Sequence, residues 1–312
     1  MENKIKVFAP ATVANVGPGF DIFGLALEGI GDELEVTLTE GDEIRIHKIE
    51  GYDDLPTDPD KNVAGIAIKA MLEALGTTQG LDIKICKLVM PGSGLGSSAS
   101  SSAAAVYAVN ELLGRPFTKT ALVQFAMEGE RASSGKAHAD NVTPALLGGF
   151  TLVRSYNPLD VVRIPYPENL YVTVIHPQIE VKTSDSKRIL RREVSLELAI
   201  SQWGNVAGLV AGLASGDFDL IGRSLVDHIV EPVRAVLIPG YAGAKQQALD
   251  AGALGCSISG SGPSIFALSN GKAIADKVAE AFTQYYAELN IDHKVYVSAI
   301  NTEGAKTINA TN

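Results

Sequence analysis

Cysteine, aromatic residues and long apolar runs are all scarce in this chain of 312 residues. Cys86 and Cys256 are too few and too far apart for a disulfide framework or a cysteine metal site, so we expect two reduced thiols. No apolar run approaches the ~18 residues that a membrane-spanning helix needs. The N-terminus lacks the basic-then-apolar order of a signal peptide. We therefore expect a cytoplasmic protein without a membrane partner.

Basic charge is also in short supply. The chain has 26 Lys and Arg residues against 36 Asp and Glu residues, a formal net charge of -10. Nucleic acids and anionic membranes are bound through an excess of basic charge, so neither is expected as a partner. The length predicts about two domains. A cluster of prolines at Pro158, Pro165 and Pro167 is the best candidate boundary, which would divide the chain into residues 1–167 and 168–312.

The chain does contain a glycine- and serine-rich stretch, P-G-S-G-L-G-S-S-A-S-S, from Pro91 to Ser101. Gly92, Gly94 and Gly96 let the backbone turn sharply and approach a ligand closely. The stretch then enters a predicted helix, whose N-terminus presents unpaired N–H groups and the positive end of the helix dipole. This pattern predicts an anion site, most often one for phosphate.

Two better-known phosphate loops are excluded. A Walker A loop needs a Gly-Lys pair after four residues, and a dinucleotide fingerprint needs G-x-G-x-x-G, whereas this loop has G-x-G-x-G and no lysine. The structural alternative is a tight turn before a small-residue helix packed on a sheet. The many serines argue against that alternative, because serine weakens a helix unless its hydroxyl is used.

Two further loops carry small or polar residues. Asn15 and Asp21 flank a turn made by Gly17, Pro18 and Gly19, so their side chains could meet at its mouth or serve only the turn itself. Late in the chain, G-S-G-P at 260–263 separates two strand-like runs. It is either an ordinary hairpin or a second loop that stands against the first.

Hydrophobic periodicity predicts the remaining elements. A first strand at 4–8 should end before Pro10, and strands 33–39 and 43–49 should form a hairpin. We expect Thr118 to cap a helix over 119–131. Further helices are expected at 63–75, 196–213, 218–229, from about 242, and at 272–288, and further strands at 81–89, 148–154, 170–176, 255–268 (as a pair) and 294–300.

The three loops, in this order, resemble the motifs of the GHMP kinases. The matching segments are P-A-T-V-A-N-V-G-P-G-F-D from residue 10, P-G-S-G-L-G-S-S-A-S-S from residue 91 and S-I-S-G-S-G-P-S from residue 257, which together span nearly the whole chain. The resemblance implies an α+β GHMP kinase fold. Its N-terminal domain resembles domain 2 of ribosomal protein S5, its C-terminal domain is ferredoxin-like, and the active site lies between them.

Within the family, the chain resembles the branch that acts on homoserine. The segments that carry this are A-N-V-G-P-G-F-D-I-F-G-L, D-P-D-K-N-V-A-G, G-K-A-H-A-D-N-V-T-P-A-L-L-G-G-F and E-P-V-R. The implied activity is ATP-dependent phosphorylation of the L-homoserine side-chain hydroxyl in threonine biosynthesis. We also expect a homodimer. The alternatives are a family kinase or ATP-dependent decarboxylase for another small acid, and a nucleotide-binding sensor.

The resemblance also implies the ATP and Mg²⁺ ligands. Ser98 and Glu130 match the residues that hold Mg²⁺, and Asn62 is an expected neighbour of the adenine. The backbone amides of the loop would hold the phosphates. The predicted nucleotide loop comprises Pro91, Gly92, Ser93, Gly94, Leu95, Gly96, Ser97, Ser98, Ala99, Ser100 and Ser101.

Homoserine is a zwitterion, so its site needs a carboxylate for the ammonium group and a cation for the carboxylate. Asp21 suits the first role and Arg234 the second, while Asn15 and Asn141 would bind the remaining polar atoms. The predicted catalytic residues are Asn141 and Asp140. Asp140 is either a general base or a supporting carboxylate; without a base, the hydroxyl proton would pass to the phosphate.

One segment departs from the family pattern. Homoserine-specific members carry Thr, three residues and then Arg, whereas counting forward from Thr183 reaches Lys187, with Arg188 directly behind it. Lysine offers a point charge where arginine offers a planar fork. We predict that Lys187 faces the substrate and that Arg234 carries most of the carboxylate binding.

Overall fold

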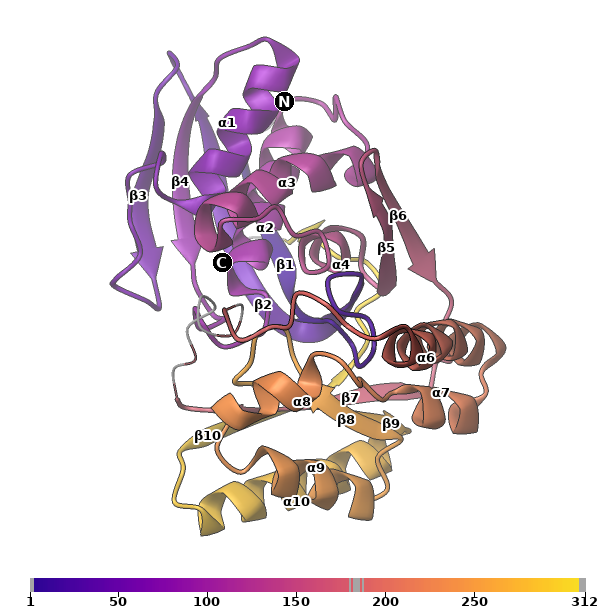
Figure 1. The fold of residues 1–312 in the computed structure, drawn as a ribbon. Coiled ribbons are helices and arrows are strands. Elements are labelled where there is room, and N and C mark those ends of the chain that lie inside the picture. The colour runs from indigo at the N-terminus through magenta and orange to yellow at the C-terminus, as the bar shows by residue number, and fades with distance from the viewer. Residues whose placement is uncertain (1–2, 180, 182–185, 187, 309–312) are drawn as a thin grey trace.

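The computed structural model describes residues 3–179, 181, 186 and 188–308, which form a seven-stranded and a four-stranded sheet. Figure 1 shows the first sheet and its helices, in indigo to magenta, above the second sheet and its helices, in orange to yellow. The chain passes from the first sheet to the second between β6 and β7, and the short strand β11 returns to pair with β1. The domain boundary at residue 167 stays a prediction.

The first sheet has the strand order β11-β1-β2-β4-β3, with β5 paired to β2 and β6 to β5. Neighbouring strands in it are antiparallel except β3 and β4, which are parallel and are joined through helix α1. The strands are β1 (Lys4–Ala14), β2 (Phe23–Thr39), β3 (Ile44–Glu50), β4 (Gly80–Cys86), β5 (Phe150–Tyr156), β6 (Leu159–Ile164) and β11 (Lys306–Thr307).

Several strand predictions are wrong in this sheet. β2 begins at Phe23 and not at residue 33, and β4 ends at Cys86 and not at residue 89. β1 does not end at Pro10 but continues to Ala14, because a register shift between Pro10 and Thr12 accommodates the residue that cannot donate a ladder hydrogen bond. The expected hairpin of 33–39 and 43–49 does not form either. β4 lies between the two strands, antiparallel to β2 and parallel to β3, so the turn at 40–43 joins strands that are not neighbours.

Helices α1 (Val63–Leu75), α2 (Ser97–Leu112), α3 (Lys119–Ser134) and α4 (Val142–Leu147) pack on the first sheet. The predicted bounds of α1 are confirmed, and Thr118 caps α3 by accepting a bond from the amide of Ala121. α2 lies between the sheet and the other helices and is buried on nearly all sides. Its alanines and serines suit that place, because small side chains let the helix approach β1 and β2 closely.

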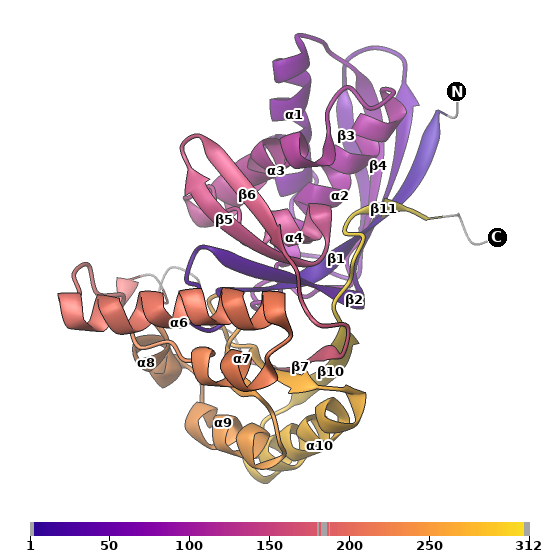
Figure 2. The same cartoon turned by 90° about the vertical axis from the view of Figure 1, so that its right-hand side faces the viewer.

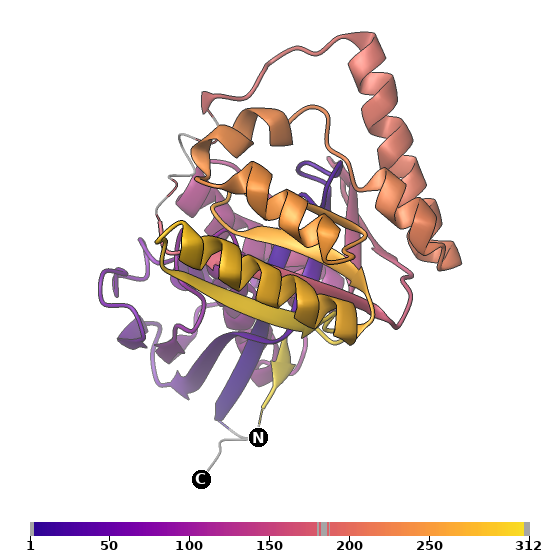
Figure 3. The ribbon, with the colours of Figure 1, turned by 90° about the horizontal axis from the view of Figure 1, so that it is seen from below.

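The second sheet has the order β10-β7-β9-β8 and is antiparallel throughout. Figure 3 shows that α9 and α10 cover its outer face. Its strands are β7 (Leu170–Pro177), β8 (Gly255–Ile258), β9 (Ile265–Asn270) and β10 (His293–Ala299), and the helices of this half are α6 (Leu196–Ser215), α7 (Phe218–Ser224), α8 (Glu231–Arg234), the 3₁₀ turn η1 (Ala235–Leu237), α9 (Tyr241–Asp250) and α10 (Lys272–Glu288).

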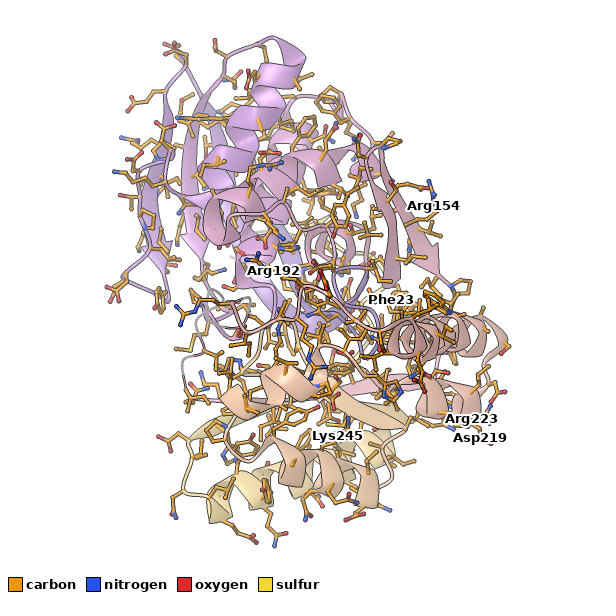
Figure 4. All side chains as sticks on the ribbon, in the orientation of Figure 1. Phe23, Arg154, Arg192, Asp219, Arg223 and Lys245 are labelled. Atoms are coloured by element: carbon orange, nitrogen blue, oxygen red, sulfur yellow. The ribbon has the colours of Figure 1, made fainter. Side chains whose placement is uncertain are left out.

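The predicted helix over 218–229 is too long. α7 ends at Ser224, and the residues after it form a loop around the side chain of Asp227. α8 then follows, held to α9 by an ion pair between Glu231 and Lys245; Figure 4 shows Lys245 between these helices. Within the described ranges, no helix is long and apolar enough to cross a membrane.

Candidate active site

The three loops singled out in the sequence meet in space. The hydroxyl of Ser259 donates to the carbonyl of Gly94 at 2.6 Å, which joins the late loop to the glycine loop. The amide of Gly260 donates to the carbonyl of Ala14 at 3.1 Å, which joins the late loop to the N-terminal turn. The hairpin at 260–263 is therefore also the second loop that stands against the first.

Two of the loop glycines are required by this packing. Gly94 and Gly96 have φ of +81° and +65°, which side-chained residues rarely adopt. A Cβ on Gly94 would lie 2.6 Å from the carbonyl oxygen of Ser259, and one on Gly96 would lie 2.0 Å from the hydroxyl of Thr12. The sequence led us to expect close approach to a ligand; the close approach seen is between the loops themselves.

Several of the serines that follow use their hydroxyls inside the protein. Ser97 donates to the carbonyl of Val89 at 2.7 Å, and Ser100 donates to the carbonyl of Ala9 at 2.7 Å. These bonds anchor the start of α2 to β1 and to the segment that follows β4. Ser98 instead lines the cleft described next.

A cleft opens where the loops meet, lined mainly by residues of the first half of the chain and, from the second half, by Arg234, Gly260 and Ser261. It brings together most of the predicted site residues. Of the nucleotide loop, Ser93, Leu95, Ala99 and Ser100 are buried and do not line the cleft. The predicted residues that line it are Asn15, Asp21, Asn62, Pro91, Gly92, Gly94, Gly96, Ser97, Ser98, Ser101, Glu130, Asp140, Asn141 and Arg234.

The described residues of the basic run after Val181 contribute no side chain to the lining of the cleft. Lys187 and Thr183 lie outside the described residues. Arg188 is described and is exposed, and it does not line the cleft. The predicted role of Lys187 therefore stays a prediction.

Acidic side chains gather on one wall of the cleft. Glu130 and Asp140 are almost fully buried, and Asp21 is about one-third exposed. Burial raises the pKa of Asp140 to about 8, and the nearby charges of Asp21 and Glu130 add to the shift. This wall therefore favours a positively charged ligand.

We expect the buried carboxyl of Asp140 to lower stability as pH rises. Its pKa is raised in the folded chain, so between pH ~4 and ~8 the folded state holds a proton that the unfolded state has lost. The free energy of unfolding should fall with pH across this window, by at most ~1.4 kcal/mol per pH unit from this group. Urea unfolding without nucleotide or metal checks this: Asp140→Asn should flatten the profile, and an unchanged slope would contradict it.

The opposite wall carries a buried cation, Arg234. Its Nη1 donates to the carbonyl of Gly260 at 2.9 Å, and its guanidinium lies 5.0 Å from the ring centroid of Phe20. Among the described residues, no carboxylate lies within 4 Å of it. A buried guanidinium whose contacts with the described residues are carbonyls and a ring is suited to an anionic ligand.

The N-terminal turn links the two walls. Asn15 donates from Nδ2 to the carbonyl of Gly260 at 2.7 Å, the same oxygen that Arg234 uses, and its Oδ1 accepts from the amide of Asp21 at 3.0 Å. The carboxylate of Asp21 lies 3.4 Å from Nδ1 of His138. Asn15 thus serves the turn and also orients Asp21 toward the cleft. His138, to which we assigned no role from the sequence, belongs to the same cluster.

Asn141 and Asn62 are also oriented by the protein. Asn141 accepts a bond from the hydroxyl of Thr12 at 2.7 Å through Oδ1, which leaves its amide nitrogen to donate. Asn62 caps α1, with Oδ1 accepting from the amide of Ala64 at 2.9 Å and Nδ2 donating to the carbonyl of Pro56 at 2.7 Å. Its expected place beside adenine stays a prediction.

Sequence reasoning missed a buried ion pair beneath the loop, between Lys87 and Asp32. Lys87 lines the cleft and donates to the carbonyl of Ser97 at 2.6 Å and to the hydroxyl of Ser101 at 2.9 Å. Asp32 is fully buried and accepts from the amides of Leu88 and Val89 as well. Asp32 directly precedes the strand predicted at 33–39 and has acidic residues close by in sequence, so no sequence signal set it apart.

Comparisons of the sequence and of the structure with known proteins find the same family of relatives. The family models described as "GHMP kinases N terminal domain" and "GHMP kinases C terminal" match residues 62–149 and 209–288. A homoserine kinase from Chlorobium phaeobacteroides is 48% identical, over 97% of this chain and 99% of that protein, and one from Chloroherpeton thalassium is 48% identical, over 96% and 98%. The crystal structure of homoserine kinase from Cytophaga hutchinsonii has 55% identity and a TM-score of 0.96, covering 99% of this chain and 98% of that one.

Proposed function

Because the chain belongs to the GHMP kinase family, we propose that it transfers the γ-phosphoryl group of ATP to the side-chain hydroxyl of L-homoserine, giving O-phospho-L-homoserine. The observation that carries the proposal is the cleft itself. It combines a glycine loop at a helix N-terminus with a carboxylate, Asp21, and a buried cation, Arg234. An anion site beside paired opposite charges suits ATP beside an amino acid.

Phosphoryl transfer depends mainly on positioning and on neutralising charge. We propose that the amides of Gly94, Gly96 and Ser97 hold the phosphates. Ser98 and Glu130 offer one hydroxyl and one buried carboxylate oxygen, which fits Mg²⁺, since this ion keeps several waters and takes few protein ligands. Bound there, Mg²⁺ would neutralise charge on the phosphates.

We propose that Asp21 binds the ammonium group of homoserine and Arg234 its carboxylate. The amide nitrogen of Asn141 would then orient the hydroxyl. The hydroxyl oxygen forms a bond to the γ-phosphorus while the bond from that phosphorus to the ADP oxygen breaks. Burial and the neighbouring charges raise the pKa of Asp140 to about 8, which makes it a poor base at pH 7. We therefore propose that the hydroxyl proton leaves with the transferred phosphoryl group.

A coupled assay of ADP release with homoserine, mevalonate, galactose and shikimate tests the proposed substrate. Homoserine should give the highest kcat/KM, since mevalonate has no ammonium group for Asp21. A higher value with mevalonate would overturn the substrate assignment. No turnover with any acceptor would favour a nucleotide-binding sensor. A homodimer and a cytoplasmic location stay predictions, and light scattering on the purified protein tests the first.

Arg234→Ala should raise the KM for homoserine by ~10²-fold and leave the KM for ATP little changed, because a charge-assisted bond to the carboxylate is lost. Steady-state kinetics with each substrate varied in turn measures this. Arg188→Ala is the matched control, since Arg188 is exposed, and Lys187→Ala should also have the smaller effect. If Arg188→Ala proves the most damaging of the three, the site must be redrawn around Arg188.

A further inference from the structure

Helix α6 lies along one side of the molecule and contributes no residue to the lining of the cleft. Figure 2 shows it at the near surface, and its apolar residues Ile200 and Trp203 are 52% and 55% exposed. Gln202, between them in sequence, is only 8% exposed. A buried amide on a largely exposed helix has a specific set of partners, and these partners connect α6 to the site.

Gln202 makes three hydrogen bonds to two separate segments. Its Nε2 donates to the carbonyl of Pro18 at 2.9 Å and to Oδ1 of Asp227 at 2.8 Å. Its Oε1 accepts from the amide of His228 at 2.9 Å. Both amide hydrogens are therefore used, one on the N-terminal turn and the other on the loop that precedes α8.

Each of these two segments is followed in sequence by one of the charged side chains that we propose binds the substrate. Pro18 lies three residues before Asp21, in the turn that orients that carboxylate. Asp227 accepts from the amides of Val230 and Glu231, at 3.0 and 2.8 Å, where the chain enters α8. Arg234 is the last residue of this short helix.

We propose that Gln202 is a positioning residue that sets the separation between Asp21 and Arg234, and so tunes the site to the length of its amino-acid substrate. The inference rests on the proposed roles of Asp21 and Arg234 in binding homoserine. The hydrogen bonds of Gln202 go to neither Asp21 nor Arg234. Without its amide, the turn and the α8 loop lose the hydrogen bonds that join them through α6. The contact of Arg234 with the Phe20 ring remains, but the two charges are held apart less precisely.

The test is Gln202→Met, which keeps the side-chain volume and removes the hydrogen bonds. We expect the KM for homoserine to rise ~10-fold, with kcat and the KM for ATP within two-fold of the parent. The preference for homoserine over serine, which is one methylene shorter, should fall by a similar factor. Gln202→Glu keeps the length, loses the donors and adds a charge beside Asp227, so it should show at least the same shift.

Asn205→Ala is the matched control. Asn205 lies three residues further along α6 and donates to the carbonyl of Val226 at 2.8 Å, next to Asp227, but this bond does not reach the N-terminal turn. It should leave all three constants near parental values. An equal shift in this control, an unchanged homoserine KM in both Gln202 variants, or failure of both to fold would each overturn the proposal.

Arg234→Ala in the same assay distinguishes a failure of the positioning role of Gln202 from a failure of the proposed substrate site. A raised homoserine KM there together with unchanged Gln202 variants would reject the positioning role and leave the proposed substrate site intact. An unchanged homoserine KM in Arg234→Ala would reject the substrate site and the positioning role together.

Discussion

Glu130→Gln is expected to lower kcat by ~10³-fold and to raise the Mg²⁺ concentration needed for half-maximal rate. The variant keeps the shape of the side chain and removes the charge that we propose binds the metal. Metal and phosphate stabilisation of this kind contributes several kcal/mol to the transition state, and each 1.36 kcal/mol is about a factor of ten in rate. Titration of activity against Mg²⁺ at saturating ATP and homoserine measures both effects.

Glu128→Gln is the matched control for this experiment. Glu128 lies on the same helix, α3, but it pairs with Arg131 at 2.9 Å and does not line the cleft. Its loss should change kcat less than two-fold. Ser98→Ala should act in the same direction as Glu130→Gln but more weakly, since a neutral oxygen is lost. Near-normal turnover of Glu130→Gln at low Mg²⁺ would remove Glu130 from the site.

The local elements were predictable because their signals are local. The bounds of α1 follow from Asn62, which caps it, and from Gly76, which ends it in the left-handed conformation. The start of α3 follows in the same way from Thr118, whereas its end lies at Ser134, three residues beyond the predicted one. The hairpin error has a different origin: β4 is inserted between β2 and β3 from a distant part of the chain, and no feature of the turn at 40–43 reports that pairing.

The cleft was partly predictable for a related reason. Its loops carry glycine motifs that a family resemblance can match, so Asp21, Ser98 and Arg234 were selected in advance. The residues that hold these side chains in place were not selected, because a residue such as Gln202 or Asp32 acquires its role only from partners far away in sequence. The same is true of Gly94 and Gly96. Their positive φ values were expected from the sequence, but the atoms that lie close to them belong to other parts of the chain and were not.

Lys87→Met should lower the free energy of unfolding by about 3–5 kcal/mol, because it leaves the carboxylate of Asp32 buried without its cation. Burial lowers the pKa of Lys87 while the charges of Asp32 and Glu130 oppose that shift, so the pair depends on mutual compensation. The loop should also loosen, because Lys87 holds the carbonyl of Ser97 at the start of α2. We therefore expect a higher KM for ATP as well as lower stability.

Urea unfolding of the single and double variants tests this account. Combining Lys87→Met with Asp32→Asn should recover part of the loss, ~1–3 kcal/mol, since the uncompensated charge is gone and the amide oxygen can still accept from Leu88 and Val89. Lys84→Met is the control: Lys84 lies on β4 and pairs with Glu50 at 3.1 Å near the surface, so its loss should cost under ~1 kcal/mol. If Lys87→Met costs no more than Lys84→Met, the buried pair does not hold the loop in place, and the higher KM for ATP should be absent too.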